Sequence, residues 1–466
     1  MTLPYQEAAS EPSSSHRIFL PFIDTDPIVD VQLALLLLPV WWWLGIEQFI
    51  WPVIFFVVLI KVLYLQRLQL VINPPIRWFF LFLFAVLASS FFIVESLRWL
   101  TYIRNFGAFT AGFLVLLVVT NRARSWNTVE KLLNAALLTT LVSGVIGLMA
   151  ITGIWHPSFQ SITGQLLPQA AASTGYGQTI AIRTLGERSW FLGLGDYFRV
   201  NGLFLFSNSY SSVLVYGIPF LFYKLGRTQG IRRFWVGLGI ILLLINLIYT
   251  TGRVATLGLL GGALYFALLH SYKRNIIRII IGIGLASTIL IVLISSFLEL
   301  TDPKQEGGLI AQTSSVADAF VFARGAGSFT SRFGVYGATL ESLADRPFFG
   351  WGTERDVEGM ELPLGSHSEY LAILYRQGFF GFLIFMALLW SVWRMSTPPG
   401  SGWADSPEIT FLRYGRWFLV TSIINSIMTD PAVDSSVYVL LWLFIALVLA
   451  TAHILYRQKR DVSKTY

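Results

Sequence analysis

Long apolar runs separated by polar connections dominate the sequence. A run of about 20 apolar residues is long enough to cross a bilayer as a helix. The runs predict about twelve such helices, near 28–46, 48–65, 77–95, 100–120, 131–152, 201–223, 234–251, 254–271, 276–298, 378–395, 410–428 and 434–456. We therefore expect an all-α polytopic membrane protein.

Two connections are much longer than the others, at 153–200 and 299–377, and both are rich in Gly, Ser, Thr and isolated charges. Long structured loops on one side of a membrane usually carry function. Within the second loop, 328–344 has an amphipathic pattern that breaks at Pro347 and Gly350. This pattern predicts a helix lying on the outer membrane surface.

The polar ends of the chain flank one predicted membrane domain, residues 28–456. Residues 1–27 form a polar leader without the basic start, apolar centre and cleavage site of a signal peptide. Residues 457–466 form a basic tail. We expect both ends to be cytoplasmic.

Composition and charge agree with this class. Of 466 residues, 55% are hydrophobic and 13% charged, with a mean hydropathy of +0.64, which excludes an ordinary soluble enzyme. The absence of cysteine excludes disulfides and thiolate chemistry. The net charge of +7 comes from basic residues in alternate loops, the positive-inside pattern, so we expect no nucleic-acid partner. The two long loops then face the outer side of the membrane, opposite to the cytoplasm.

The stretch GSHSEYLAILYRQGFFGFLIF places polar residues at the head of an apolar segment. From His367 to Trp393 there are 27 residues, about 40 Å as one helix, against a hydrocarbon core of about 30 Å. We expect a break at Arg376-Gln377-Gly378. Residues His367 to Tyr375 would then form a short outer helix, with His367 and Tyr370 on one face.

Several arginines lie where a basic residue is unusual. Arg253 sits in a very tight connection between two predicted spans, Arg199 precedes another, and Arg332 lies in the predicted surface helix one turn before Tyr336. Snorkelling explains any one of them, and polar contact between helices explains Asn208. Together they map to one side of the membrane. Because a guanidinium is a permanent planar fork of donors, the set favours binding of a lipid-linked diphosphate.

His367 supplies a group that arginine lacks. A neutral imidazole takes up a proton near neutral pH, although a histidine at a helix start also serves as a cap or a headgroup contact. Glu369 is either a second base or a first-turn residue favoured by the helix dipole. Metal chemistry has little support, because Asp24-Thr25-Asp26 lies in the predicted leader and Glu47 is the one acidic residue of the first outer connection.

Four stretches resemble the O-antigen ligase and polysaccharide polymerase family: RVNGLFLFSNSYS, TTGRVATLGLL, SRFGVYGATLESLADRPFFGWGTE and GSHSEYLAILYRQGFFGF. The resemblance covers roughly 195–395. The commonest form in the family is His-Asn-x-Tyr-Leu. Here Tyr370 and Leu371 match, and Ser368 replaces the asparagine.

The resemblance implies a metal-independent, inverting glycosyltransferase of the membrane-embedded (GT-C) type in the bacterial inner membrane. It would move a glycan from undecaprenyl diphosphate to a sugar hydroxyl of a glycan or a lipid core on the periplasmic face. Arg253 and Arg332 would hold the diphosphate, and His367 would orient or deprotonate the acceptor. The further candidate substrate contacts are Arg199, Arg376, Tyr336, Tyr370, Glu369 and Asn208.

Two alternatives stay open at this point. A ligase and a polymerase of this family share the donor chemistry and differ in the acceptor, so lipopolysaccharide and exopolysaccharide products are both compatible with the sequence. A transporter of a small anion such as bicarbonate belongs to another class, as does an assembly protein. Transporters generally show repeated halves and broken helices, and neither is clear in this sequence.

Overall fold

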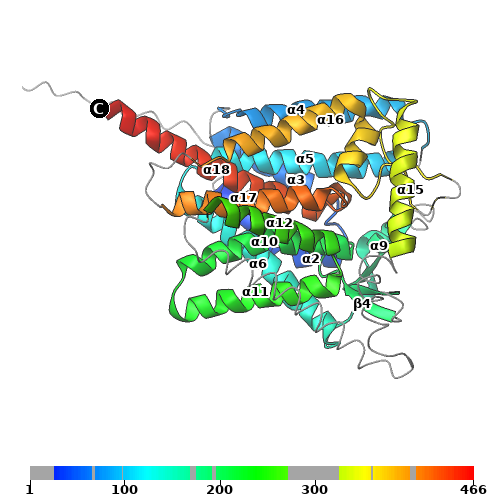
Figure 1. The fold of residues 1–466 in the computed structure, drawn as a ribbon, viewed down its shortest axis with the longest axis horizontal. Coiled ribbons are helices and arrows are strands. Elements are labelled where there is room, and N and C mark those ends of the chain that lie inside the picture. Colours follow the sequence, from blue (N-terminus) through cyan, green and yellow to red (C-terminus); the bar gives the residue numbers. More distant parts are fainter. Residues whose placement is uncertain are drawn as a thin grey trace, which may run out of the picture.

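The computed structural model is a bundle of long helices with a further helix across one end (Figure 1). It describes residues 26–65, 69–96, 98–167, 175–190, 196–270, 325–357, 360, 362–398 and 406–465. The chain is mostly helical, with little sheet, as the sequence predicts.

The elements before residue 201 are α1 (Pro27–Leu36), α2 (Leu38–Leu44), α3 (Ile50–Leu65), α4 (Pro74–Ser89), η1 (Ser90–Phe92), α5 (Arg98–Arg122), α6 (Trp126–Ile151), β1 (Ser158–Gln160), α7 (Ile162–Leu166), α9 (Gly175–Ala181), β2 (Ile182–Thr184), β3 (Gly186–Trp190) and β4 (Asp196–Val200). The later elements are α10 (Ser207–Arg227), α11 (Gly230–Thr250), α12 (Arg253–His270), α15 (Gly325–Leu343), α16 (Glu369–Met395), α17 (Pro407–Ser426), η3 (Pro431–Val433) and α18 (Ser435–Thr465).

Short polar side chains determine where several helices begin. The side chains of Asp26, Asn73, Ser125 and Ser406 each accept a hydrogen bond from a main-chain N–H in the first turn of α1, α4, α6 and α17. Helices α1, α4 and α17 also carry proline in that turn, where its missing N–H costs nothing. The polar connections of the sequence thus mark helix starts.

The predicted spans lie on helices, apart from 276–298, which is outside the described residues. In the described part, six helices are long and apolar enough to cross a membrane: α4 with η1, α5, α6, α11, α16 and α18 up to Gln458. Helices α1 and α2, bent by 54°, make a seventh if they count as one span. The number twelve stays a prediction. The last helix also continues to Thr465, through most of the predicted basic tail.

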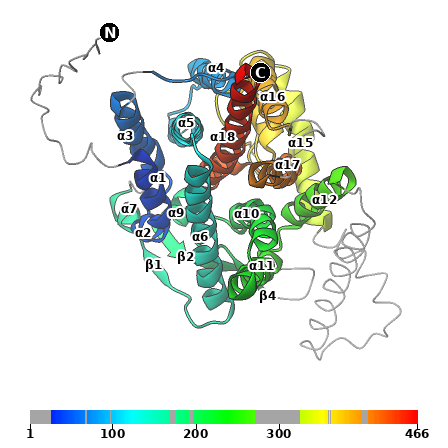
Figure 2. The ribbon, with the colours of Figure 1, turned by 90° about the vertical axis from the view of Figure 1, so that its left-hand side faces the viewer.

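Helix α18 is the centre of the bundle. It packs against α5, α6, α10 and α17, and its apolar part is almost completely buried. In the view along the bundle, α18 lies among α5, α16 and α17, whereas α11 is at the edge (Figure 2). A helix that is apolar on all sides belongs in such a position.

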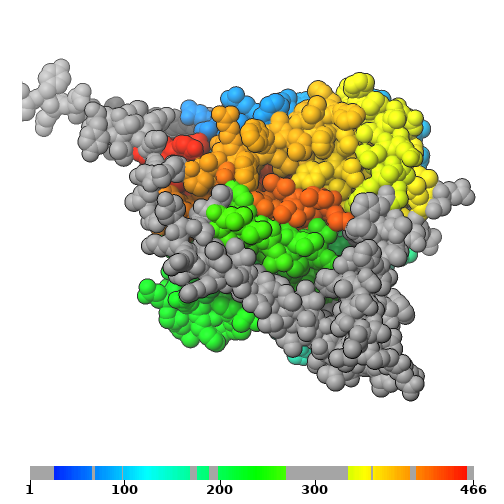
Figure 3. All heavy atoms as spheres, viewed as in Figure 1, coloured from blue at the N-terminus to red at the C-terminus, as the bar shows by residue number. Residues whose placement is uncertain are grey.

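One end of the bundle carries the long connections, and we call it the hairpin end. Strands β1 and β2 pair there as one antiparallel hairpin and β3 and β4 as another, so the predicted loop at 153–200 contains two short hairpins that the sequence pattern did not predict. Aromatic side chains attach the first hairpin: the rings of Phe159 and Trp42 are 5.8 Å apart. Helix α15 lies across this end, with its atoms next to those of α16 in the space-filling view (Figure 3). It ends before Pro347, as predicted.

Candidate functional site

The loop before α16 holds His367 at the hairpin end. Two side chains of α15 attach this loop: the Tyr336 hydroxyl donates to the His367 carbonyl (3.1 Å), and the Gly365 N–H donates to Thr339 Oγ1 (3.1 Å). On the other side, Glu369 N donates to the carbonyl of Thr429 (2.9 Å). The position of His367 is therefore fixed by two parts of the chain that are distant in sequence.

His367 itself is not helical, which corrects the expected short helix from His367 to Tyr375. Its φ is 61°, in the left-handed region, and α16 begins at Glu369. A residue in that conformation cannot belong to a right-handed helix. His367 and Tyr370 consequently do not share a helix face. The Tyr370 hydroxyl donates instead to the carbonyl of Ile423 in α17 (3.1 Å).

Ser368 is the N-cap of α16. Its hydroxyl accepts a hydrogen bond from Leu371 N (3.4 Å). Serine and asparagine are both favourable at this position, because each has a short side chain with an acceptor oxygen. The replacement of the commoner asparagine by Ser368 therefore preserves the start of the helix.

The expected break in α16 is confirmed at Gly378, where φ is 68° and ψ is −173°. A Cβ there would lie 2.3 Å from the carbonyl carbon of Phe348, so no other residue fits. Main-chain groups around the break are satisfied by hydrogen bonds from Trp351 N to Tyr375 O (2.9 Å), from Gly352 N to Arg376 O (2.8 Å) and from Phe379 N to Pro347 O (2.7 Å). The segment after α15 thus completes the broken helix, as a bilayer requires.

Arg253 is the first residue of α12, at the same end of the bundle. It follows Thr251, which closes α11 in the left-handed conformation, and Gly252. A Cβ on Gly252 would lie 2.5 Å from Cβ of Ser211 in α10, so the chain passes very close to that helix. This packing places Arg253 where α10, α11 and α12 meet.

Arg199 in β4 reaches the same junction. Its guanidinium donates to the carbonyl of Thr250, the last residue of α11 (3.3 Å), and to Oδ1 of Asn208 (3.3 Å), and it pairs with Glu187 at 3.4 Å. A cation at a helix C-terminus is favourable because the free carbonyls carry partial negative charge. Arg199 and Asn208 therefore hold together the junction that positions Arg253. Their predicted contacts with substrate stay predictions.

Arg332 lies in α15 one turn before Tyr336, the residue bound to the His367 carbonyl. The predicted surface helix thus carries both an arginine and the hydrogen-bond donor that positions the histidine loop. The hydrogen bond from Tyr336 therefore joins the helix that contains Arg332 to the loop of His367.

Arg376 belongs to a buried charge cluster that the sequence did not reveal. Its guanidinium pairs with Glu354 at 2.6 Å and with Asp430 at 2.8 Å, and Glu354 also binds Arg104 at 2.9 Å. Arg376 donates in addition to the carbonyl of Gly365 (2.9 Å). The cluster, Arg104, Glu354, Arg376 and Asp430, is therefore connected to the loop of His367. Arg104 and Arg376 both lie in apolar segments of the sequence. Because such charges need acidic partners, these two arginines were the signal from which the cluster could have been predicted.

A second buried polar group joins the other elements of this end. Glu47 pairs with Arg183 of β2 at 2.8 Å, and Gln48 donates to Asp434 (3.1 Å), which also accepts from Leu205 N (3.0 Å). Glu47 is thus the partner of an arginine.

Glu369, at 4% exposure, is buried as well, next to Ser426. Asp26 caps α1, whereas Asp24 lies outside the described residues.

We expect Glu354→Gln to lower the free energy of unfolding by about 1.5–3 kcal/mol at pH 7, because the two arginines lose a charged acceptor. Burial alone would raise the pKa of Glu354, but Arg376 and Arg104 outweigh it and lower the pKa. A lowered pKa stabilises the fold above the unfolded value of about 4.3, and that stability is lost as the pH falls through the folded pKa. The difference in the free energy of unfolding between Glu354→Gln and the unchanged chain should therefore become smaller in acid.

Unfolding in detergent, followed by tryptophan fluorescence at pH 7 and at about pH 2, measures this difference. The matched control is Glu341→Gln, an exposed carboxylate of α15, which should unfold like the unchanged chain at both pH values. Equal stability of Glu354→Gln and the control at pH 7 would contradict a stabilising role of the charge cluster.

A comparison with known families finds one similar family. Residues 238–386 match the family model described as O-antigen ligase. This stretch of the chain is similar to that family. The matched stretch runs from α11 into α16 and includes Arg253, Arg332, His367 and Arg376, whereas Arg199 precedes it. No curated protein matches the chain. The family is one of membrane glycosyltransferases of the ligase and polymerase type, and the apolar helices of this chain agree with a multi-pass membrane protein.

Proposed function

We propose that this chain transfers a glycan from undecaprenyl diphosphate to a sugar hydroxyl, on the periplasmic face of the bacterial inner membrane, with inversion and without a metal. The observation that carries the proposal is the hydrogen bond from Tyr336 to the carbonyl of His367 (3.1 Å). It connects the helix of Arg332 directly to the histidine loop. A basic donor site and an acceptor site would thus be adjacent at one end of the bundle.

The donor site would consist of Arg253 and Arg332. Arg253 begins α12, so a diphosphate there would also interact with the positive end of a helix dipole. Guanidinium groups bind phosphate oxygens through two parallel hydrogen bonds. The charge that develops on the leaving diphosphate would thereby be neutralised by the protein. Arg199 and Asn208 would hold this site in place, and Arg376, already paired with two carboxylates, would position the loop of His367.

The acceptor side would be served by His367. Its imidazole would take the proton of the acceptor hydroxyl as the oxygen attacks the anomeric carbon, while the bond from that carbon to the diphosphate oxygen breaks. The attack comes from the side opposite to the leaving group, which inverts the anomeric centre. Glu369, buried two residues further, would support the start of α16 and is the second candidate base.

A transporter is the competing function from another class, since broken helices occur in transporters. The break in α16 differs from those, because Pro347, Trp351 and Gly352 supply hydrogen bonds to the main chain around it. A break closed by protein groups offers no carbonyls to a passing ion. We therefore prefer the enzyme.

Purified protein in detergent tests the proposal, since no membrane gradient exists there. With a lipid-linked glycan and an acceptor, we expect transfer that continues when a chelator is added. A lipid-core acceptor that is elongated would identify a ligase, and a second lipid-linked glycan that is elongated would identify a polymerase. No transfer to either acceptor, together with anion uptake by vesicles containing the protein, would overturn the proposal in favour of a transporter.

A further inference from the structure

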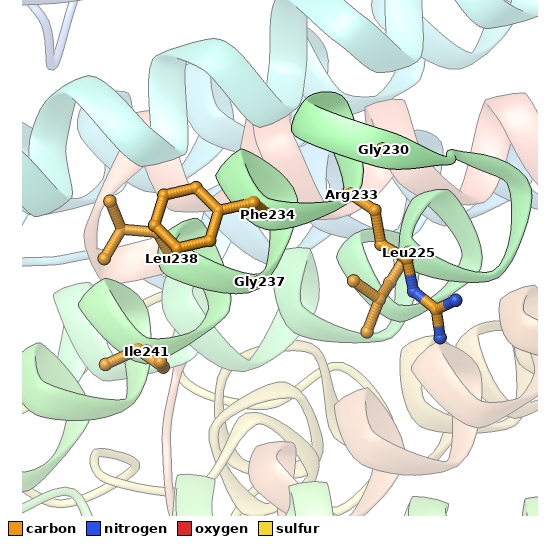
Figure 4. A pocket seen from close by; sticks show the side chains of 7 residues that line it. All are labelled: Leu225, Gly230, Arg233, Phe234, Gly237, Leu238 and Ile241. Atoms are coloured by element: carbon orange, nitrogen blue, oxygen red, sulfur yellow. The ribbon is translucent and has the colours of Figure 1, made fainter.

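A groove of about 440 Å³ lies at the end of the bundle opposite to the hairpin end, between the last turns of α10 and the first turns of α11 (Figure 4). This volume falls in the range of small-molecule sites, about 300–1,000 Å³. Helix α11 has 21 residues, so Gly230 at the start of the groove is roughly 30 Å from the Thr250 end that Arg199 binds, and Ile241 is roughly 14 Å from it. The groove is lined by Leu225, Gly230, Arg233, Phe234, Gly237, Leu238 and Ile241.

The wall of the groove formed by α11 is apolar and open. Phe234, Leu238 and Ile241 follow one face of the helix and are exposed, at 61%, 44% and 54%. Two glycines leave room between the helices: a Cβ on Gly230 would meet no atom within 4 Å, and one on Gly237 would approach a Leu225 methyl to 3.9 Å. An extended hydrocarbon chain fits a shallow groove of this kind.

A cationic side chain lies at one end of this apolar wall. Figure 4 shows the Arg233 guanidinium beside Leu225, with Phe234, Leu238 and Ile241 gathered on the other side. Arg233 makes no hydrogen bond or ion pair with any residue that the structure describes. Within the described part of the chain, no acceptor therefore competes with a ligand for its donors.

We propose that this groove binds an anionic phospholipid, with its phosphate at Arg233 and one acyl chain along Phe234, Leu238 and Ile241. The position is right for such a ligand, because the start of α11 is the boundary between a polar connection and an apolar span. The guanidinium of Arg233 can donate two parallel hydrogen bonds to the phosphate. The acyl chain would cover apolar side chains that otherwise contact other lipids. The site is separate from the proposed glycan-transfer site and does not depend on its function.

The test measures lipid retention by the full-length protein, purified in detergent, using native mass spectrometry. Phosphatidylglycerol should be retained, and phosphatidylcholine with the same acyl chains should not. Arg233→Gln should weaken phosphatidylglycerol binding about fivefold, the effect of one basic residue at a membrane surface. Gly237→Leu, which fills the groove without changing charge, should weaken it as well. The matched control is Arg232→Gln, a neighbouring arginine outside the groove.

Three outcomes would overturn the proposal. Equal weakening by Arg232→Gln would indicate diffuse attraction of anionic lipid to a basic surface. Equal retention of phosphatidylcholine would indicate ordinary lipid contact without recognition of charge. Displacement of the phospholipid by glycerol 3-phosphate at equal concentration would indicate an anion site that does not use the apolar wall. Weakening by both groove variants, with an unchanged control, supports the site.

Discussion

Replacing His367 by asparagine is expected to lower the rate of glycan transfer by about 10²–10⁴-fold, the usual effect of losing a general base. Asparagine tolerates the left-handed conformation that His367 adopts, with φ of 61°. The loop should therefore keep its shape, including the hydrogen bond from Tyr336 to the carbonyl of residue 367. Because the arginines are untouched, binding of the lipid-linked donor should stay nearly unchanged.

Single-turnover transfer and a separate donor-binding measurement distinguish these effects. His156→Asn is the matched control, because His156 is an exposed histidine near the first hairpin. Normal transfer by a folded His367→Asn protein would leave His367 as a structural residue of the loop. Loss of donor binding would place it in the diphosphate site and would refute the division of roles. Strong loss in Glu369→Gln, with tolerance at His367, would assign the base to Glu369.

Lysine at Arg253 or Arg332 is expected to reduce transfer by roughly 10²-fold while the protein still folds. Lysine keeps the charge but offers no planar fork, so it cannot make two parallel hydrogen bonds to a phosphate. The defect should appear in donor binding and in the rate, whereas binding of the acceptor should be retained. This pattern is opposite to that expected for His367→Asn.

The same exchange at the other end of the bundle, Arg232→Lys, is the control for a general effect of replacing arginine. It should transfer glycan at the normal rate. Wild-type transfer by both Arg253→Lys and Arg332→Lys would rule out the diphosphate role. A defect confined to Arg253→Lys would point to a site at the junction of α10, α11 and α12 without α15.

Local features of the sequence were sufficient for much of the fold. The apolar runs located the helices, the amphipathic pattern located α15, and Gly378 marked the break in α16. These properties depend on residues that are neighbours in the chain, and apolar length and glycine geometry act there directly. The two hairpins of 153–200 were missed, because their strands of three to five residues have no pattern long enough to distinguish them from loops.

The sequence by itself thus determined a mostly helical chain with membrane-spanning helices, and it provided the candidate residues for the proposed diphosphate site and proton transfer, in their order along the chain. Only the tertiary structure decided how they are held. Arg104 and Glu354 are 250 residues apart, yet they bind each other, and Tyr336 binds the carbonyl of His367 from another helix. Such pairs form because a buried charge or polar group must find a partner in three dimensions, and no local pattern specifies which distant residue folding brings within reach.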